Sequence, residues 1–281
     1  MSRVRVGELD IAYRVTGAGP ALLLVAGTGY NGGTWWPGMV NDLAREYTVI
    51  TYDHRGTGRT RGPSGPFSTR TLARDALGLL AALGVSGAHV LGHSMGGRVA
   101  QWMALEGGAR VGGLVLAASG PGPLPGHEDR HTPGIPVATA AGMVELGYDG
   151  YVRRLQRDTF FTESYALAHP EPVDWLFDAF WAGRPTVTDY FRHVMARQQH
   201  DTVELLRLIA HPTLVLVGDE DAHAGGTGSH LEQSLYLARA LPSATLSVIP
   251  GVKHGYFWEA PVESVGRVKR WLAGVDTVVT S

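Results

Sequence analysis

The 281-residue sequence contains no cysteine, which excludes disulfide bonds, thiol nucleophiles and cysteine-ligated metals. It also lacks an apolar leader and any apolar run long enough to span a bilayer, so no membrane association is expected. The chain also lacks a large excess of acidic or basic residues. The formal net charge is −2 and no basic stretch is interleaved with aromatics, which argues against nucleic acid as a partner. These absences together predict a cytoplasmic protein, and they leave open its self-association into a homo-oligomer.

What the chain does contain is an alternation of two patterns. Its hydrophobic content of 44% is sufficient for one domain with a large core. Strand-like apolar runs occupy residues 11–15, 21–25, 47–52, 88–91, 111–117, 213–217 and 245–249. Helical patterns occupy residues 36–45, 69–83, 95–106, 231–241 and 261–273. The alternation predicts an α/β fold, with a mostly parallel sheet of roughly eight strands flanked by helices on both faces.

One region interrupts this alternation. Residues 120–201 open with a stretch rich in proline and glycine and continue as aromatic-rich helical segments without a strand candidate. We therefore expect a helical cap over 120–201, inserted into a core domain made of residues 1–119 and 202–281. The last residues, 275–281, are expected to be frayed.

Ser94 is the most informative residue. It follows a short apolar strand pattern and precedes a helical one, in the sequence Gly-His-Ser-Met-Gly at residues 92–96. A serine on a tight strand-to-helix turn, with glycine two positions before and after it, is the nucleophile-elbow pattern. The glycines are needed because side chains there would collide with the neighbouring strand and helix. The alternative is a glycine-rich turn of a nucleotide-binding unit.

A serine hydroxyl needs a base to activate it and an acid to orient that base. His254 follows the strand pattern at 245–249, and Asp219, Glu220 and Asp221 follow the one at 213–217. Loops at the carboxyl ends of parallel strands share one edge of the sheet, so we expect these side chains near Ser94. His254 is the candidate base, and all three acids are candidates for the orienting role.

The loop after the strand at 21–25 contains three glycines within residues 27–32 and is the expected source of an oxyanion-binding N–H group. We predict an oxyanion hole made of the backbone N–H groups of Thr28 and Met95. The alternative is a merely flexible loop. A phosphate-binding role is weaker still, because no Gly-Lys-Ser/Thr follows.

No metal or cofactor is expected. His223 and His230, near the acidic loop, and His127 and His131, at the start of the predicted cap, match no standard spacing of metal ligands. We interpret them as solvated loop residues.

With these motifs, and with the Asp-x-Arg-Gly-x-Gly turn at residues 53–58, the chain resembles the α/β-hydrolase superfamily over nearly its whole length. It is most similar to cap-bearing esterases, enol-lactonases and C–C bond hydrolases. The resemblance implies a triad of Ser94, Asp221 and His254, because Gly-x-x-Asp after that strand is the family pattern. It also implies that the turn is structural. We expect Asp53 and Arg55 to bond backbone groups and each other.

Two departures from the family pattern stand out. Ala26 precedes Gly27 where the family usually has histidine, which indicates a changed loop rather than lost activity. Gly255 follows His254 where C–C bond hydrolases tend to have tryptophan, which disfavours that reaction.

The resemblance implies a serine hydrolase that cleaves a carboxylic ester or lactone of a small, mainly apolar molecule. The alternatives are C–C bond cleavage of a β-diketone-like substrate and a slow or non-catalytic binding protein. Tyr30, Trp35 and Trp181 are predicted to line the substrate pocket; the alternative for each is ordinary core between cap and sheet. A substrate carboxylate would find candidate partners among the arginines at 153, 154, 157, 184, 192 and 197.

Overall fold

The computed structural model describes residues 1–126, 134–222 and 228–279. The described residues form an eight-stranded sheet in the order β1-β2-β4-β3-β5-β6-β7-β8. Strand β2 pairs antiparallel with β1 and β4, and the remaining neighbours are parallel, so the predicted α/β fold is confirmed. The strands are β1 Ser2–Val6, β2 Leu9–Thr16, β3 Ala21–Val25, β4 Thr48–Tyr52, β5 Ala88–His93, β6 Val111–Ala117, β7 Thr213–Gly218 and β8 Ala244–Ile249.

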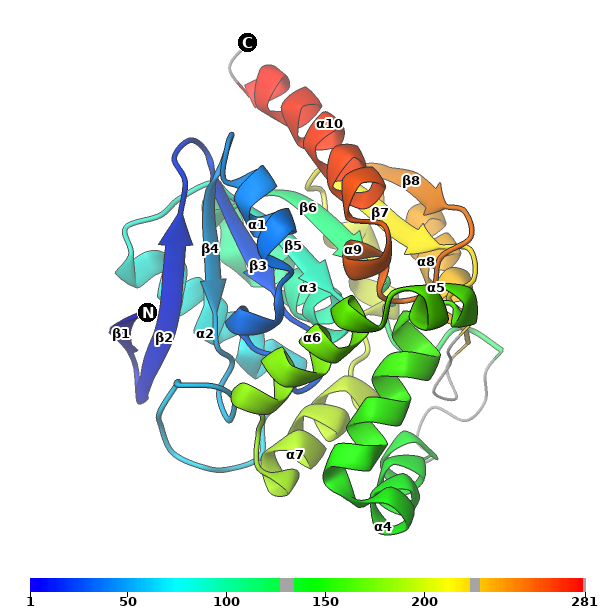
Figure 1. The fold of residues 1–281 in the computed structure, drawn as a ribbon. Helices are drawn as coiled ribbons and strands as arrows, with labels where there is room; N and C mark the ends of the chain where they lie inside the picture. Colours follow the sequence, from blue (N-terminus) through cyan, green and yellow to red (C-terminus); the bar gives the residue numbers. More distant parts are fainter. Residues whose placement is uncertain (127–133, 223–227, 280–281) are drawn as a thin grey trace.

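Helices cover both faces of the sheet (Figure 1). Side chains alternate along a strand, so Leu22 and Leu24 of β3 pack toward one face, while Leu23 and Val25 pack toward the other. One face is covered by α1 Pro37–Leu43, α9 Tyr256–Glu259 and α10 Pro261–Val279, and the other by α2 Thr69–Ala82, α3 Met95–Gly107 and α8 His230–Ala240. No helix of the described ranges is both long and apolar enough to cross a membrane.

Between β6 and β7, the described residues contain helices and no strand. The helices are α4 Gly134–Leu155, broken at Gly147 where φ is 73°, a π-helical turn Gln156–Phe160, α5 Glu163–Ala168, α6 Pro170–Ala182, α7 Val187–Gln198 and a short 3-10 helix Val203–Leu208. We call residues 134–198 the helical segment. It is bonded to loops that follow strands β4 and β8, because Gly58 N donates to Gly183 O and Gly255 N donates to Phe160 O. The helices therefore lie together at that edge of the sheet (Figure 1).

Both ends of the chain differ from the sequence-based expectation. Strand β1, which alternates arginine and valine at the sheet edge, was not among the predicted strands; its Val6 packs against Gly78 of α2. The expected fraying from residue 275 is wrong, since α10 continues to Val279. Its Asp276 accepts hydrogen bonds from His89 Nε2 at 2.8 Å and from the Tyr47 hydroxyl at 3.2 Å. These bonds to the sheet side hold the last turns in place.

Candidate active site

Ser94 stands between the end of β5 and the start of α3 with φ 58° and ψ −119°. A positive φ is unfavourable for a residue with a side chain, so the surrounding structure must hold it. The Ser94 N–H donates to Ala117 O at 2.8 Å, and the Ser119 hydroxyl donates to Ser94 O at 2.8 Å. Strained backbone held by such bonds is typical of functional sites.

The glycines around Ser94 are required by space. A Cβ on Gly92 would lie 2.2 Å from Gly96 O, and a Cβ on Gly96 would lie 2.0 Å from Val25 O. Both contacts involve backbone atoms, which cannot rotate away. Close packing of β5 and α3 at this turn therefore depends on glycine at both positions.

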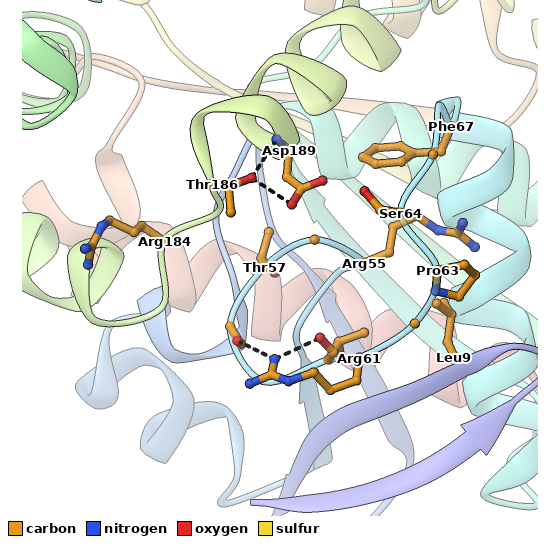
Figure 2. Close-up of a pocket in the computed structure, with 15 residues that line it drawn as sticks. Leu9, Arg55, Thr57, Arg61, Pro63, Ser64, Phe67, Arg184, Thr186 and Asp189 are labelled. Atoms are coloured by element: carbon orange, nitrogen blue, oxygen red, sulfur yellow. Dashed lines mark hydrogen bonds between the residues drawn. The ribbon is translucent and has the colours of Figure 1, made fainter.

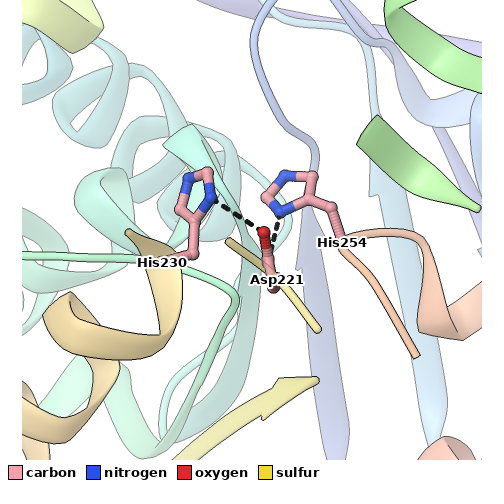
Figure 3. Close-up of side chains that lie close together, drawn as sticks. All are labelled: Asp221, His230 and His254. Carbon is pink, nitrogen blue, oxygen red and sulfur yellow. Dashed lines mark hydrogen bonds and ion pairs between the residues drawn. The ribbon is translucent and has the colours of Figure 1, made fainter. Parts of the chain in front are cut away.

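The Asp221 and His254 side chains point toward one another (Figure 3). Asp221 lies in the loop after β7 and His254 in the loop after β8, and His254 Nδ1 donates to Asp221 Oδ2 at 2.7 Å. Both residues are buried. The Nε2–H of His93, the residue before Ser94, donates to His254 O at 2.9 Å, which ties the His254 loop to the elbow. With Nδ1 donating to the carboxylate, the neutral His254 ring carries its lone pair on Nε2, as a general base requires.

A second histidine bonds the same carboxylate. His230 Nδ1 donates to Asp221 Oδ1 at 3.1 Å, so the two imidazoles approach Asp221 from its two sides (Figure 3). Burial lowers the pKa of His230 to about 4, so its ring is neutral at pH 7. Burial raises the pKa of Asp221, yet the electrostatic attraction and hydrogen bonds of His254 and His230 hold it well below its usual range. Asp221 is therefore an ionised acceptor of two N–H bonds.

The interpretation of His230 as a solvated loop residue is wrong. A capping box of Ser229 and Glu232 starts α8 and places His230 at its first position, 6% exposed. Ser-x-x-Glu is visible in the sequence as a helix start, but the orientation of the preceding loop is not. His127, His131 and His223 lie outside the described residues.

Asp221, His230 and His254 bring their ligand-type atoms within 4.8 Å of one another, so metal binding has to be considered. Both Nδ1 atoms donate to Asp221 in the described structure. A metal would need their lone pairs instead and would replace both hydrogen bonds. The arrangement therefore fits a hydrogen-bonded orienting group better than a set of metal ligands.

The loop after β3 lies against Ser94. Gly27 O accepts from Tyr30 N at 3.1 Å, and Gly29 between them has φ 74°, so the loop makes a tight turn that glycine favours. A Cβ on Gly27 would lie 3.3 Å from Ser94 Cβ. Thr28 is in this turn, and Met95 is the first residue of α3, where backbone N–H groups have no partner within the helix. Their role as oxyanion donors stays a prediction.

The turn after β4 supports that loop. His54 Nε2 donates to Ala26 O at 3.1 Å, and Asp53 accepts from Gly32 N at 3.0 Å and from Arg59 N at 2.7 Å. Where the family usually has a histidine at the position of Ala26, this chain places the ring of His54, from the loop after β4, in a hydrogen bond to the Ala26 carbonyl. The expected Asp53–Arg55 bond is wrong: Arg55 instead makes two bonds of 2.6 Å to Asp75 of α2.

The three predicted substrate-binding aromatics occupy different surroundings. Tyr30 is buried, stacks on Phe160 and accepts a bond from Gln156. Trp35 stacks on Trp258 and meets the His93 ring edge-on. Trp181 of α6 is partly exposed, stacks on Phe177 and lies 4.1 Å below the Arg184 guanidinium. Contact with substrate stays a prediction for all three.

A separate pocket of about 260 Å³ lies between the loop at residues 55–67 and the junction of α6 and α7 (Figure 2). The arginines that line it already have hydrogen-bond or ion-pair partners within the protein. Arg55 is paired with Asp75, Arg61 donates to Gly58 O and Thr60 O, and Arg184 donates to Trp181 O. These bonds stabilise the turn and the helix end, and none of the triad candidates lines this pocket.

The family described as the alpha/beta hydrolase fold matches residues 20–261. The chain belongs to the α/β-hydrolase family. It is 31% identical over 254 residues to the putative carbamate hydrolase RutD of Azorhizobium caulinodans, covering 89% of this chain and 90% of that one. It is similar to a thermophilic esterase from Thermogutta terrifontis, with TM-score 0.80, 27% identity and coverage of 98% and 99%. Est816, described as an N-acyl homoserine lactone degrading enzyme, gives TM-score 0.78, 27% identity and coverage of 95% and 98%. This α/β-hydrolase is a hydrolytic enzyme, and its resemblance to esterases is confirmed.

Proposed function

We propose that this α/β-hydrolase cleaves a carboxylic ester or lactone of a small, mainly apolar molecule through an acyl-enzyme on Ser94. The observation that carries the proposal is the 2.7 Å bond from His254 Nδ1 to buried Asp221, next to a serine with strained backbone. His254 Nε2 takes the Ser94 proton as Ser94 attacks the carbonyl carbon. Asp221 orients the imidazole and stabilises its charged form.

The oxyanion of the tetrahedral intermediate lies between the N–H groups of Thr28 and Met95. His254 then protonates the leaving alcohol, and the ester bond breaks to give the acyl-enzyme. A water molecule, deprotonated by His254, releases the acid and restores Ser94. The aromatic surroundings of Tyr30 and Trp35 support an apolar substrate body. The helical segment acts as the cap over this site.

Carbamates are a second candidate class, favoured by the relative named as a carbamate hydrolase. They undergo the same attack at a carbonyl carbon and can lose the same alcohol, but that carbon carries a nitrogen, so the intermediate is a carbamoyl-enzyme. C–C bond cleavage is less supported, because Gly255 leaves no room for the tryptophan of that class: a Cβ there would lie 2.6 Å from Phe160 O.

The first experiment is intact-protein mass spectrometry after incubation with a fluorophosphonate, on wild type and Ser94→Ala. We expect one adduct on wild type and none on the variant. Turnover of p-nitrophenyl butyrate, γ-butyrolactone and a phenyl carbamate then ranks the substrate classes. Ser94→Ala should lower kcat by several orders of magnitude, and adding His254→Ala should lower it little further, since triad members act as a unit.

Two outcomes would overturn the proposal. An unlabelled wild type that is folded and inactive on all three substrates would favour a binding protein. Activity that is lost on dialysis against a chelator and restored by zinc would assign Asp221, His230 and His254 to a metal instead.

A further inference from the structure

Arg197 lies on the inner face of α7. It follows Tyr190 by seven residues, which is two helical turns, and the buried residues of this helix include Tyr190, His193 and Val194. Its carbonyl oxygen accepts from Arg98 Nη1 at 2.8 Å. Arg98 belongs to α3, the helix that starts beside Ser94, so the end of α7 is anchored close to the elbow.

The neighbours of Arg197 belong to the candidate active site. The Tyr190 ring packs on the oxyanion loop, because a Cβ on Gly29 would lie 2.7 Å from it. Burial dominates the pKa of both Tyr190 and His230, raising the first and lowering the second, and the Arg197 charge contributes to each by lowering it. The guanidinium is therefore within electrostatic range of the oxyanion-loop side and of the histidine that bonds Asp221.

Within the described ranges, no side chain or carbonyl accepts a hydrogen bond from the Arg197 guanidinium, and no carboxylate pairs with it. Three other arginines of the helical segment do have acidic partners: Arg153 with Asp174, Arg154 with Glu145, and Arg192 with Asp189.

Arg98, the neighbour of Arg197, is a second guanidinium without a carboxylate partner among the described residues. In the described part of the chain it bonds only neutral acceptors, Arg197 O and Gln233 Oε1, and burial together with the Arg197 charge lowers its pKa to about 9. Asp221 already accepts from two histidines. Two neighbouring guanidinium groups thus lie near the site, and no carboxylate of the described residues is bonded to either.

A partly buried guanidinium without a counter-ion is costly unless a ligand supplies one. Its planar fork matches a carboxylate, and a nearby phenol can donate a further bond. We infer that Arg197 binds a carboxylate of the substrate, with the Tyr190 hydroxyl as a second donor. The inference rests on the proposed function and narrows it to an ester or lactone that carries one additional carboxylate on an otherwise apolar body.

The test compares substrate pairs that differ by one carboxylate. On the acyl side the pair is p-nitrophenyl valerate and the mono-p-nitrophenyl ester of glutaric acid. On the alcohol side it is phenyl butyrate and 4-carboxyphenyl butyrate. Each is measured with wild type, Arg197→Gln, Arg197→Lys and the matched control Arg239→Gln, an exposed arginine of α8.

For at least one pair, Arg197→Gln should lower kcat/KM on the carboxylate substrate by about 10- to 100-fold, as expected for a lost charged hydrogen bond. The neutral partner should change little, Arg197→Lys should recover part of the loss, and Arg239→Gln should match wild type. Equal losses on charged and neutral substrates of both pairs would overturn the inference. If Arg197→Gln does not fold, the wild-type measurements alone test the inference. A wild type that prefers the carboxylate substrate in neither pair would overturn it. If wild type hydrolyses only the neutral esters, the proposed ester hydrolysis stands, but the inferred recognition of a substrate carboxylate by Arg197 is overturned.

Discussion

Replacing Gly96 by alanine should disturb the nucleophile elbow without touching a catalytic group. The new Cβ would lie 2.0 Å from Val25 O, 2.7 Å from Val25 C and 2.8 Å from Ala26 O. An ordinary contact begins at 3.4 Å, so α3 and the end of β3 must separate by about 1.4 Å. Overpacking typically costs 1–3 kcal/mol, and rigid backbone on both sides puts this site at the upper end, about 3 kcal/mol. The same shift moves the oxyanion loop relative to Ser94, which should lower kcat by about 100-fold.

Gly274→Ala is the matched control, because Gly274 is also helical but a Cβ there meets nothing within 4 Å. It should raise the free energy of unfolding by about 0.5–1 kcal/mol through the reduced entropy of the unfolded chain. Both variants are compared with wild type by urea denaturation and by the rate of fluorophosphonate labelling. The reasoning is refuted if Gly96→Ala is as stable as Gly274→Ala and labels at the wild-type rate.

Asp221→Asn should lower kcat by about 10⁴-fold, because the amide would favour the wrong tautomer of His254. Asp219→Asn should leave kcat nearly unchanged, since that carboxylate accepts from a loop amide at 2.7 Å; the reverse order would move the orienting role to Asp219. Burial lowers the pKa of His54 and His230 from 6.5 to about 4, so between these values the unfolded chain binds protons that the folded chain excludes. The free energy of unfolding should therefore fall from pH 6.5 toward pH 4 by about 1.4 kcal/mol per pH unit for each histidine, and a flat urea-midpoint profile from pH 7 to 5 would contradict this.

Sequence reasoning worked best where burial dictates the residue type. Strands buried on both faces, such as residues 111–117, read as continuous apolar runs, and the helix boundaries at Thr69 and Met95 agree with the structure. Strand β1 lacks such a run, because one of its faces is exposed at the edge of the sheet. The ordered end of α10 depends on Asp276 bonding His89, a contact 187 residues apart that no local pattern encodes.

The same limit applies to the site. The placement of Ser94, Asp221 and His254 at one edge of the sheet was predictable, because each follows a parallel strand. Their catalytic roles stay a prediction. His230 follows no strand. It reaches Asp221 because α8 starts at that point and its first residue points back toward the loop. Likewise, the sequence offers six arginines as equal candidates for binding a substrate carboxylate. Only the packing of the fold separates Arg197 from the three that pair with acidic side chains.

The helical segment and the His254 loop are joined in a way that bears on specificity. Gly255 N donates to Phe160 O at 2.8 Å, and the Phe160 ring meets the His254 ring edge-on at 5.1 Å. At the other end of the segment, Arg98 of α3 holds the carbonyl of Arg197. The segment is therefore bonded beside both the proposed base and the proposed nucleophile. A substrate group held by Arg197 would be positioned relative to Ser94 and His254 by backbone contacts rather than by long side chains, and such fixed geometry is what allows binding energy to contribute to rate.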